Sequence, residues 1–186
     1  FPEMPPQRAV VYAQAQHPVT ADRIRVVTYN ILASIYATST MFGYCPIWAL
    51  AWNFRKGRIL NEIIGYDADV LCMQEVQADH FESFLYPQLS AIGYEGLYKK
   101  KTREAFGPKG RIDGCAMFYK RSKFTLRVNN VIEFNEAAMK MANEDRFHNP
   151  IPMEGDNTNS INRLLRDNVA QICVLEMVGQ YGVPIQ

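Results

Sequence analysis

The sequence lacks the features that mark several specialised classes of protein. No apolar run approaches the ~20 residues that span a bilayer, and the first ten residues, FPEMPPQRAV, contain no apolar signal-peptide core. Neither sign of charge is in excess, because 20 Lys and Arg residues stand against 19 Asp and Glu. No overall basic field would hold the chain on nucleic acid or on an anionic membrane, so any binding of phosphate must be local. We therefore expect no membrane partner.

Cysteine and histidine are scarce and scattered. The four cysteines form no C-x-x-C pair, the three histidines show no metal-ligand spacing, and no N-x-[ST] sequon is present. This pattern favours buried free thiols in a reducing compartment over a disulfide framework. We expect the protein in the cytoplasm, the nucleus or both.

The residues that are present are typical of a folded domain. The chain has 186 residues, 48% hydrophobic and 21% charged, which suits a sizeable core in one domain or in part of a larger one. Residues 1–21 are rich in Pro, Gln and Ala without a sustained period, and predict a flexible lead-in. The folded part is expected over 22–186.

Apolar periodicity predicts strands and helices in the folded part. Strands are expected at 23–29, 69–74, 94–100, 113–120, 124–134 and 167–177, and helices at 48–64, 81–89 and 135–143. We expect Gly65 to cap the first helix, Pro87 to bend or interrupt the second, and the strands at 113–120 and 124–134 to form a hairpin. The order of elements predicts a mixed α/β sandwich in which helices cover the sheets.

The first strand–helix–strand unit carries the most informative polar residues. A right-handed crossover makes its two strands parallel, so Asn30 and Glu75 at their carboxyl ends would meet on one rim of the sheet. A carboxylate there can bind Mg²⁺, which prefers oxygen ligands, and the Asn amide can hold a phosphate oxygen or an attacking water. From the residues alone, polar strand ends that merely face solvent remain the alternative.

Four other residues are assigned structural roles. Asp113, which precedes a glycine, is more typical of a turn than of a catalytic base. Trp48 and Trp52, at helical spacing, are expected in the core rather than as platforms for stacked bases. Arg55 falls on the polar face of the same helix.

Six segments resemble the carbon-catabolite-repressor type of poly(A) deadenylase, a branch of the endonuclease/exonuclease/phosphatase superfamily. They are TYNILA at 28–33, GYCPIWALAWNFRK at 43–56, ADVLCMQEV at 68–76, IDGCAMFYK at 112–120, EFN at 133–135 and RDNVAQICVLE at 166–176. The resemblance runs in order from about Asp22 to Met177. The Tyr-Cys-Pro-Trp-Ala-Leu-Trp block is far more specific than the bare Asn and Gln-Glu signatures of the superfamily.

The resemblance implies both a fold and an activity. The fold is an α/β (α+β) four-layer sandwich of two packed mixed sheets flanked by helices, of which 22–186 would be the N-terminal, incomplete part. The activity is that of a magnesium-dependent 3′-to-5′ exoribonuclease, with one or two Mg²⁺ ions, that shortens mRNA poly(A) tails and releases adenosine monophosphate. Its partners would be poly(A) RNA and the scaffold of a deadenylase complex.

The resemblance also implies roles for individual residues. Glu75 would be the magnesium ligand, and Asn30 would orient the phosphate or the attacking water. Lys101 stands near the position of a substrate-facing lysine, although a run of lysines is also typical of a solvated loop. Asn168 could touch the site or cap the start of a strand.

Two later motifs of the family have no counterpart in this chain. These are the Gly-Asp-Phe-Asn strand end and the closing Ser-Asp-His, which would supply the Asp that activates water and the His that stabilises the phosphate. We therefore expect the isolated chain to be inactive. The alternatives are a non-catalytic, truncated relative that binds RNA or a complex partner, and a nucleotide phosphodiesterase of the same superfamily.

Overall fold

The computed structural model describes residues 11, 23–102, 112–148, 165 and 167–179. The predicted lead-in at 1–21 lies outside these residues, apart from Val11. The described elements are, in order, β1 (Val26–Asn30), α1 (Ile47–Leu50), α2 (Trp52–Tyr66), β2 (Val70–Gln77), α3 (Ala78–His80), η1 (Phe81–Leu85), α4 (Tyr86–Ala91), β3 (Tyr94–Lys100), β4 (Asp113–Lys120), β5 (Phe124–Glu133), α5 (Phe134–His148) and β6 (Val169–Met177). Within these ranges no helix is long and apolar enough to cross a membrane.

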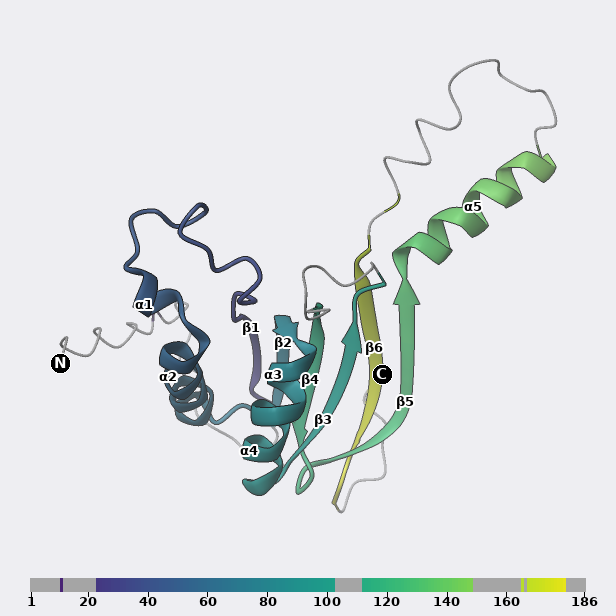
Figure 1. Cartoon of the computed structure of the whole chain (residues 1–186). Coiled ribbons are helices and arrows are strands. Elements are labelled where there is room, and N and C mark those ends of the chain that lie inside the picture. Colours follow the sequence, from purple (N-terminus) through teal and green to yellow (C-terminus); the bar gives the residue numbers. More distant parts are fainter. Residues whose placement is uncertain (1–10, 12–22, 103–111, 149–164, 166, 180–186) are drawn as a thin grey trace.

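The strands form two sheets (Figure 1). The first has the order β1-β2-β4-β3, in which β1 and β2 are parallel and the other neighbours are antiparallel. The parallel pair is the one that the intervening helix α2 predicts, because a crossover connection returns the chain to the same end of the sheet. The second sheet consists of the antiparallel strands β5 and β6.

The predicted hairpin of β4 and β5 is wrong. The two strands follow each other through a short turn, but β4 pairs with β2 and β3, whereas β5 pairs with β6 in the other sheet. Met117 and Tyr119 of β4 instead pack against Phe124 and Leu126 of β5. Alternating apolar residues define the buried face of a strand, and they do not define which edge it pairs with.

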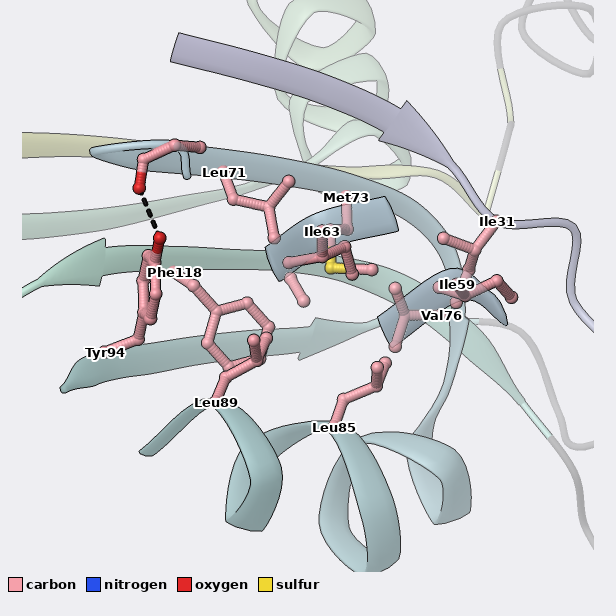
Figure 2. Packing of buried hydrophobic residues seen from close by; sticks show 12 residues of the cluster. Ile31, Ile59, Ile63, Leu71, Met73, Val76, Leu85, Leu89, Tyr94 and Phe118 are labelled. Atoms are coloured by element: carbon pink, nitrogen blue, oxygen red, sulfur yellow. Dashed lines mark hydrogen bonds between the residues drawn. The ribbon is translucent and has the colours of Figure 1, made fainter. Parts of the chain in front are cut away.

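Two apolar cores hold the layers together. The first lies between the helices and one face of the four-stranded sheet, where Ile59 and Ile63 of α2 share one cluster with Leu85, Leu89 and Phe118 (Figure 2). The second lies between the two sheets. Helices, first sheet and second sheet are therefore successive layers, in agreement with the expected α/β sandwich.

The helix predicted over 48–64 is divided and ends later than expected. Ala51, with an extended backbone at ψ 136°, separates α1 from α2. Gly65 lies inside α2 and does not cap it. The cap is Asp67, whose φ of 47° is left-handed and whose N–H bonds to the carbonyl of Ile64. Asp and Asn tolerate this conformation better than most other residues that carry a side chain.

The second predicted helix is also longer than expected. Helical structure continues from α3 through the π-helical turn η1 to α4, from 78 to 91. Pro87 lies in the first turn of α4 and does not interrupt this stretch. The π-helical turn directly before α4 is the departure from α-helical geometry in this stretch. The third helix, α5, extends to His148 and projects away from the sheets (Figure 1).

We predict that Gly114 cannot be replaced without loss of stability. A Cβ atom on Gly114 would lie 2.1 Å from the carbonyl oxygen of Lys99 on the neighbouring strand, and that backbone atom cannot move aside. Gly114→Ala should therefore lower the free energy of unfolding by about 1–3 kcal/mol, measured by urea denaturation. The matched control is Gly57→Ala at an exposed position of helix α2, where an added Cβ would have no atom within 4 Å. This control should raise stability by up to about 1 kcal/mol. An unchanged urea midpoint for Gly114→Ala would contradict the close approach of β3 and β4.

Candidate functional site

Asn30 and Glu75 lie together at the rim of the first sheet, as the sequence predicts. Asn30 is the last residue of β1 and pairs with Gln74 of β2. The Nδ2 group of Asn30 donates a 2.7 Å hydrogen bond to Oε1 of Glu75. A backbone bond of 3.1 Å from Ile31 N–H to the Gln74 carbonyl continues the ladder past the end of β1. The register of the two parallel strands therefore determines the distance between the two side chains.

A β-bulge determines the direction of Glu75. Between the pairs Met73–Ala116 and Val76–Gly114, two residues of β2 oppose a single residue of β4. Glu75 lies in this bulge with φ 55°, a left-handed conformation that costs a non-glycine residue about 1–2 kcal/mol. A bulge breaks the alternation of side chains and re-aims one of them. Backbone strain of this kind occurs preferentially at functional sites.

Tyr98 of β3 supports the bulge from the helical side of the sheet. Its hydroxyl donates a 3.0 Å hydrogen bond to the carbonyl of Val76, the residue after Glu75. Burial raises the pKa of the Tyr98 phenol well above its usual value, and nearby negative groups including Asp113 act in the same direction. The hydroxyl therefore remains a proton donor at every physiological pH.

The segment that follows β1, residues 31–37, is named here the β1 loop. Oε2 of Glu75 accepts a 3.2 Å hydrogen bond from the N–H of Ala33. Oδ1 of Asn30 accepts a 2.9 Å bond from the N–H of Leu32, which itself has φ 58°. The two candidate site residues thus hold the first turn of the β1 loop as well as each other.

Arg55 and Gln77 hold the same loop from two other elements. Arg55 of α2 donates to the carbonyls of Ile31 and Leu32, both at 2.8 Å, and to Oγ of Ser34 at 3.1 Å. Burial lowers the pKa of this guanidinium, but from a value so high that it stays charged. Gln77, at the end of β2, accepts a 2.8 Å bond from the backbone N–H of residue 35.

Asp113 is wholly buried and forms an ion pair with Lys101. It is the first residue of β4 and not a turn residue, so that prediction is wrong. Lys101 Nζ lies 2.8 Å from Oδ2 of Asp113, and the Tyr36 hydroxyl donates a 3.0 Å bond to Oδ1. The Lys101 side chain is 19% exposed. The structure therefore gives Lys101 a specific partner instead of a place in a solvated loop.

Asn168 lies at the same edge as Lys101. It is exposed, directly before β6, and its carbonyl accepts a 3.2 Å bond from the N–H of Phe134. The carbonyl of the preceding residue, Asp167, accepts a 3.2 Å bond from Thr102, the neighbour of Lys101. The backbone of Asn168 thus joins β6 to the start of α5, while its side chain is accessible to solvent.

Sequence reasoning misses Arg55, Gln77 and Asp113 as parts of this site. Periodicity places Arg55 on the solvent face of a helix, yet its guanidinium is half-buried against the β1 loop. Gln77 and Asp113 lie opposite each other at the ends of β2 and β4, and both side chains are buried. The sequence signal that could have indicated Gln77 and Asp113 is a polar residue at the end of a strongly apolar strand. This signal does not identify the residue to which the polar side chain bonds.

An open cleft of about 560 Å³ adjoins the β1 loop. Ser34, Asn53, Asp79 and His80 are among its lining residues. Trp52 also lines it, but the indole ring is stacked on the ring of His80, with centroids 3.9 Å apart. Trp52 is partly buried, packs against the first apolar core and meets Phe84 edge-on, with ring centroids 5.9 Å apart, which confirms its structural role.

Trp48 differs from Trp52. Its side chain is 50% exposed and contacts Phe54 edge-on, with ring centroids 4.8 Å apart. The prediction that Trp48 belongs to the core is wrong, because the break before α2 turns α1 away from the apolar face of that helix.

Glu75 is the residue of this rim best suited to hold a metal ion. In the part of the chain that the structure describes, no three His, Cys, Asp or Glu side chains are grouped closely enough to enclose a metal. Mg²⁺ does not require such a cage, because it is often bound by one or two carboxylates, several waters and the phosphates of a substrate. Each Glu75 oxygen can accept more than one partner, so its bonds to Asn30 and Ala33 are compatible with a cation.

Comparison with known proteins agrees with this geometry. The family model described as the endonuclease/exonuclease/phosphatase family matches residues 27–168. Carbon catabolite repressor protein 4 homolog 1 of Arabidopsis thaliana is 46% identical over 160 residues, which are 86% of this chain and 26% of that protein. The Schizosaccharomyces pombe CCR4-Not complex 3′-5′-exoribonuclease subunit Ccr4 is 36% identical over 176 residues, covering 91% of this chain and 24% of that protein.

A solved structure shows the same fold. The crystal structure of ANGEL2, a 2′,3′-cyclic phosphatase, in complex with adenosine-2′,3′-vanadate matches 87% of this chain and 38% of that chain, with 34% identity and a TM-score of 0.63. The chain spans about a quarter of the length of the curated relatives named above. The matched residues include all of β1 but its first residue, the whole of β2, and the rim that carries Asn30 and Glu75. The chain belongs to the endonuclease/exonuclease/phosphatase family.

Proposed function

We propose that the protein is a magnesium-dependent 3′-to-5′ exoribonuclease that shortens mRNA poly(A) tails. The observation that carries this proposal is the Asn30–Glu75 pair, which a strained β-bulge aims at the rim of a parallel strand pair. The S. pombe relative is named a 3′-5′-exoribonuclease, and it supports the direction of cleavage. Poly(A) specificity rests on the resemblance of the six motifs to deadenylases.

In this proposal Glu75 holds the cation and Asn30 holds the substrate. Bound Mg²⁺, as one or two ions, would polarise the scissile phosphodiester. Asn30 has two N–H donors on Nδ2, of which one bonds to Glu75, so the other can donate to a phosphate oxygen. Lys101 and Asn168, at the neighbouring edge, would bind the RNA backbone. Arg55 and Gln77 would keep the β1 loop, and hence the rim, in one conformation.

We also propose a partner and a location for the complete protein. The S. pombe relative is named a subunit of the CCR4-Not complex, which supports a deadenylase scaffold as the partner of this protein. Such a complex would act in the cytoplasm, the nucleus or both. We propose that the domain lies over 22–186. The alternative is a non-catalytic relative that would bind RNA or the scaffold without cleaving RNA.

The second candidate is hydrolysis of a different phosphoester at the same site. The observation that favours it is the likeness to ANGEL2, which is described as a 2′,3′-cyclic phosphatase. We expect the complete native protein, as distinct from the isolated 186-residue chain, to shorten an RNA with a 3′ adenosine tail and to release adenosine monophosphate, detected on a denaturing gel and by chromatography. A matched RNA that ends in a 2′,3′-cyclic phosphate distinguishes the candidates. Opening of that phosphate without shortening would contradict the deadenylase proposal.

Replacement of Glu75 should remove activity together with metal binding. Glu75→Gln keeps the size of the side chain but removes its charge, so kcat of the native protein should fall by about 100-fold or more. The affinity for Mn²⁺, used as a probe and measured by electron paramagnetic resonance, should fall as well. The control is Glu82→Gln on the exposed side of η1, which should change neither quantity. Retained activity in Glu75→Gln would contradict the metal assignment.

Replacement of Asn30 should separate turnover from binding. Asn30→Ala removes the amide that can contact phosphate, and it also leaves Glu75 Oε1 without that bond. Because Asn30 is proposed to act on the reacting phosphate, kcat should fall more than the affinity for RNA. The measurements are kcat and the Kd of a fluorescent oligoadenylate in calcium buffer. Equal losses in both would mean that Asn30 only binds substrate.

A further inference from the structure

The buried carboxylate of Asp113 binds Lys101, the lysine of the 99–101 run whose ammonium lies beside the β1 loop. Asp113 has no exposed surface, and its two oxygens have different partners: Lys101 Nζ at 2.8 Å and the Tyr36 hydroxyl at 3.0 Å. Lys101 Nζ also lies 5.6 Å from the centre of the Tyr36 ring. Three elements, β4, the end of β3 and the β1 loop, thus meet at a single carboxylate.

The backbone around Asp113 cannot shift easily. Asp113 pairs with Gln77 across the sheet, and its carbonyl accepts a 3.0 Å bond from the N–H of Lys101. The next residue, Gly114, lies so close to β3 that even a methyl group would collide with it. The carboxylate is therefore held at one position, and any group that binds to it is held with it.

The same carboxylate is coupled to the rim that carries Glu75. Tyr36 belongs to the β1 loop, whose backbone Glu75 holds at Ala33 and Gln77 holds one residue before Tyr36. Glu75, Gln77 and Asp113 thus contact successive points of one short loop. Movement of Asp113 would be transmitted to Lys101 directly and to the rim through Tyr36.

We propose that Asp113 is a positioning residue, which holds the Lys101 ammonium beside the rim so that it meets a phosphate of the RNA in one orientation. This inference rests on the proposed function. A lysine side chain has several rotatable bonds whose freedom is lost on binding, and prior ordering removes that cost from substrate binding and from the transition state. An ammonium has three N–H donors, so it can bind a carboxylate and a phosphate oxygen at once. The Lys101 side chain keeps the 19% exposure that such a contact requires.

The test is a kinetic comparison of Asp113→Asn with Lys101→Met in the native protein on A-tailed RNA. Asp113→Asn keeps the size of the side chain and an acceptor for Tyr36, but releases Lys101. Its kcat should fall by about 10- to 100-fold with little change in KM, because the lysine still attracts RNA but is misplaced. Lys101→Met should lower kcat at least as much as Asp113→Asn does, and it should also raise KM and reduce the salt dependence of RNA binding by about one phosphate contact, a slope change of ~0.7.

The double variant decides whether Asp113 acts through Lys101. If it does, Asp113→Asn should cause no further loss of kcat in the Lys101→Met background. Full additivity of the two losses would overturn the proposal. So would an unchanged kcat per folded molecule in Asp113→Asn, with the folded fraction measured by circular dichroism.

A second buried carboxylate provides the matched control. Asp69, at the opposite end of β2, is 5% exposed in its side chain and pairs with Lys120 and Lys123 at 3.2 and 2.8 Å. Asp69→Asn should lower the melting temperature without changing kcat. If Asp113→Asn behaved in the same way, its role would be purely structural and the proposal would be wrong.

Two further outcomes can be distinguished from these: a variant that does not fold, and a native protein that does not act on RNA. Should Asp113→Asn fail to fold, Asp113→Glu keeps the charge but displaces it by one methylene, and it should still lower kcat; a kcat equal to that of the native protein would overturn the proposal. Failure of the native protein to shorten A-tailed RNA would contradict the proposed function. An active native protein with a fully active Asp113→Asn variant would contradict only the role of Asp113.

Discussion

Parallel backbone pairing of β1 with β2 determines where the polar residues of this chain can meet. The register places Asn30 opposite Gln74, and the bulge that follows brings the next residue, Glu75, back toward β1. The helix α2 makes this pairing possible because it returns the chain across the sheet with its apolar face buried on Phe118 and its neighbours. Without the first core, the two strand ends would have no fixed relation to each other.

The β1 loop forms part of the rim and is held in place by side chains from neighbouring elements. A loop with exposed backbone is ordinarily mobile, because its N–H and carbonyl groups bond to water. Here Arg55 satisfies two carbonyls, while Glu75 and Gln77 accept from N–H groups of the same loop. Side chains from α2 and β2 therefore replace water as the partners of the loop. A preorganised rim of this kind suits a reaction in which charge develops on a phosphate.

Much of the fold could be predicted from local patterns, and the errors share one cause. The sequence predicts the strand at 94–100 with the bounds that the structure shows, and Gly93 directly before it marks its start. The hairpin of β4 and β5 was not formed, since each strand buries one apolar face and either of two sheets could receive it. The prediction of a core position for Trp48 was wrong for a similar reason. The periodicity of apolar residues continues across Ala51, although the helix does not.

Sequence patterns alone predict the family, the sandwich architecture and the meeting of Asn30 with Glu75, because motif spacing and the handedness of a crossover are properties of the chain. Two features are visible only in the folded molecule: Glu75 lies in a left-handed bulge, and Asp113 is buried as the counterion of Lys101. The physical reason is that both features depend on close approach between β2, β3 and β4, which are far apart in the sequence. A local pattern reports which face of a strand is apolar, whereas a bulge and an ion pair require a specific neighbour.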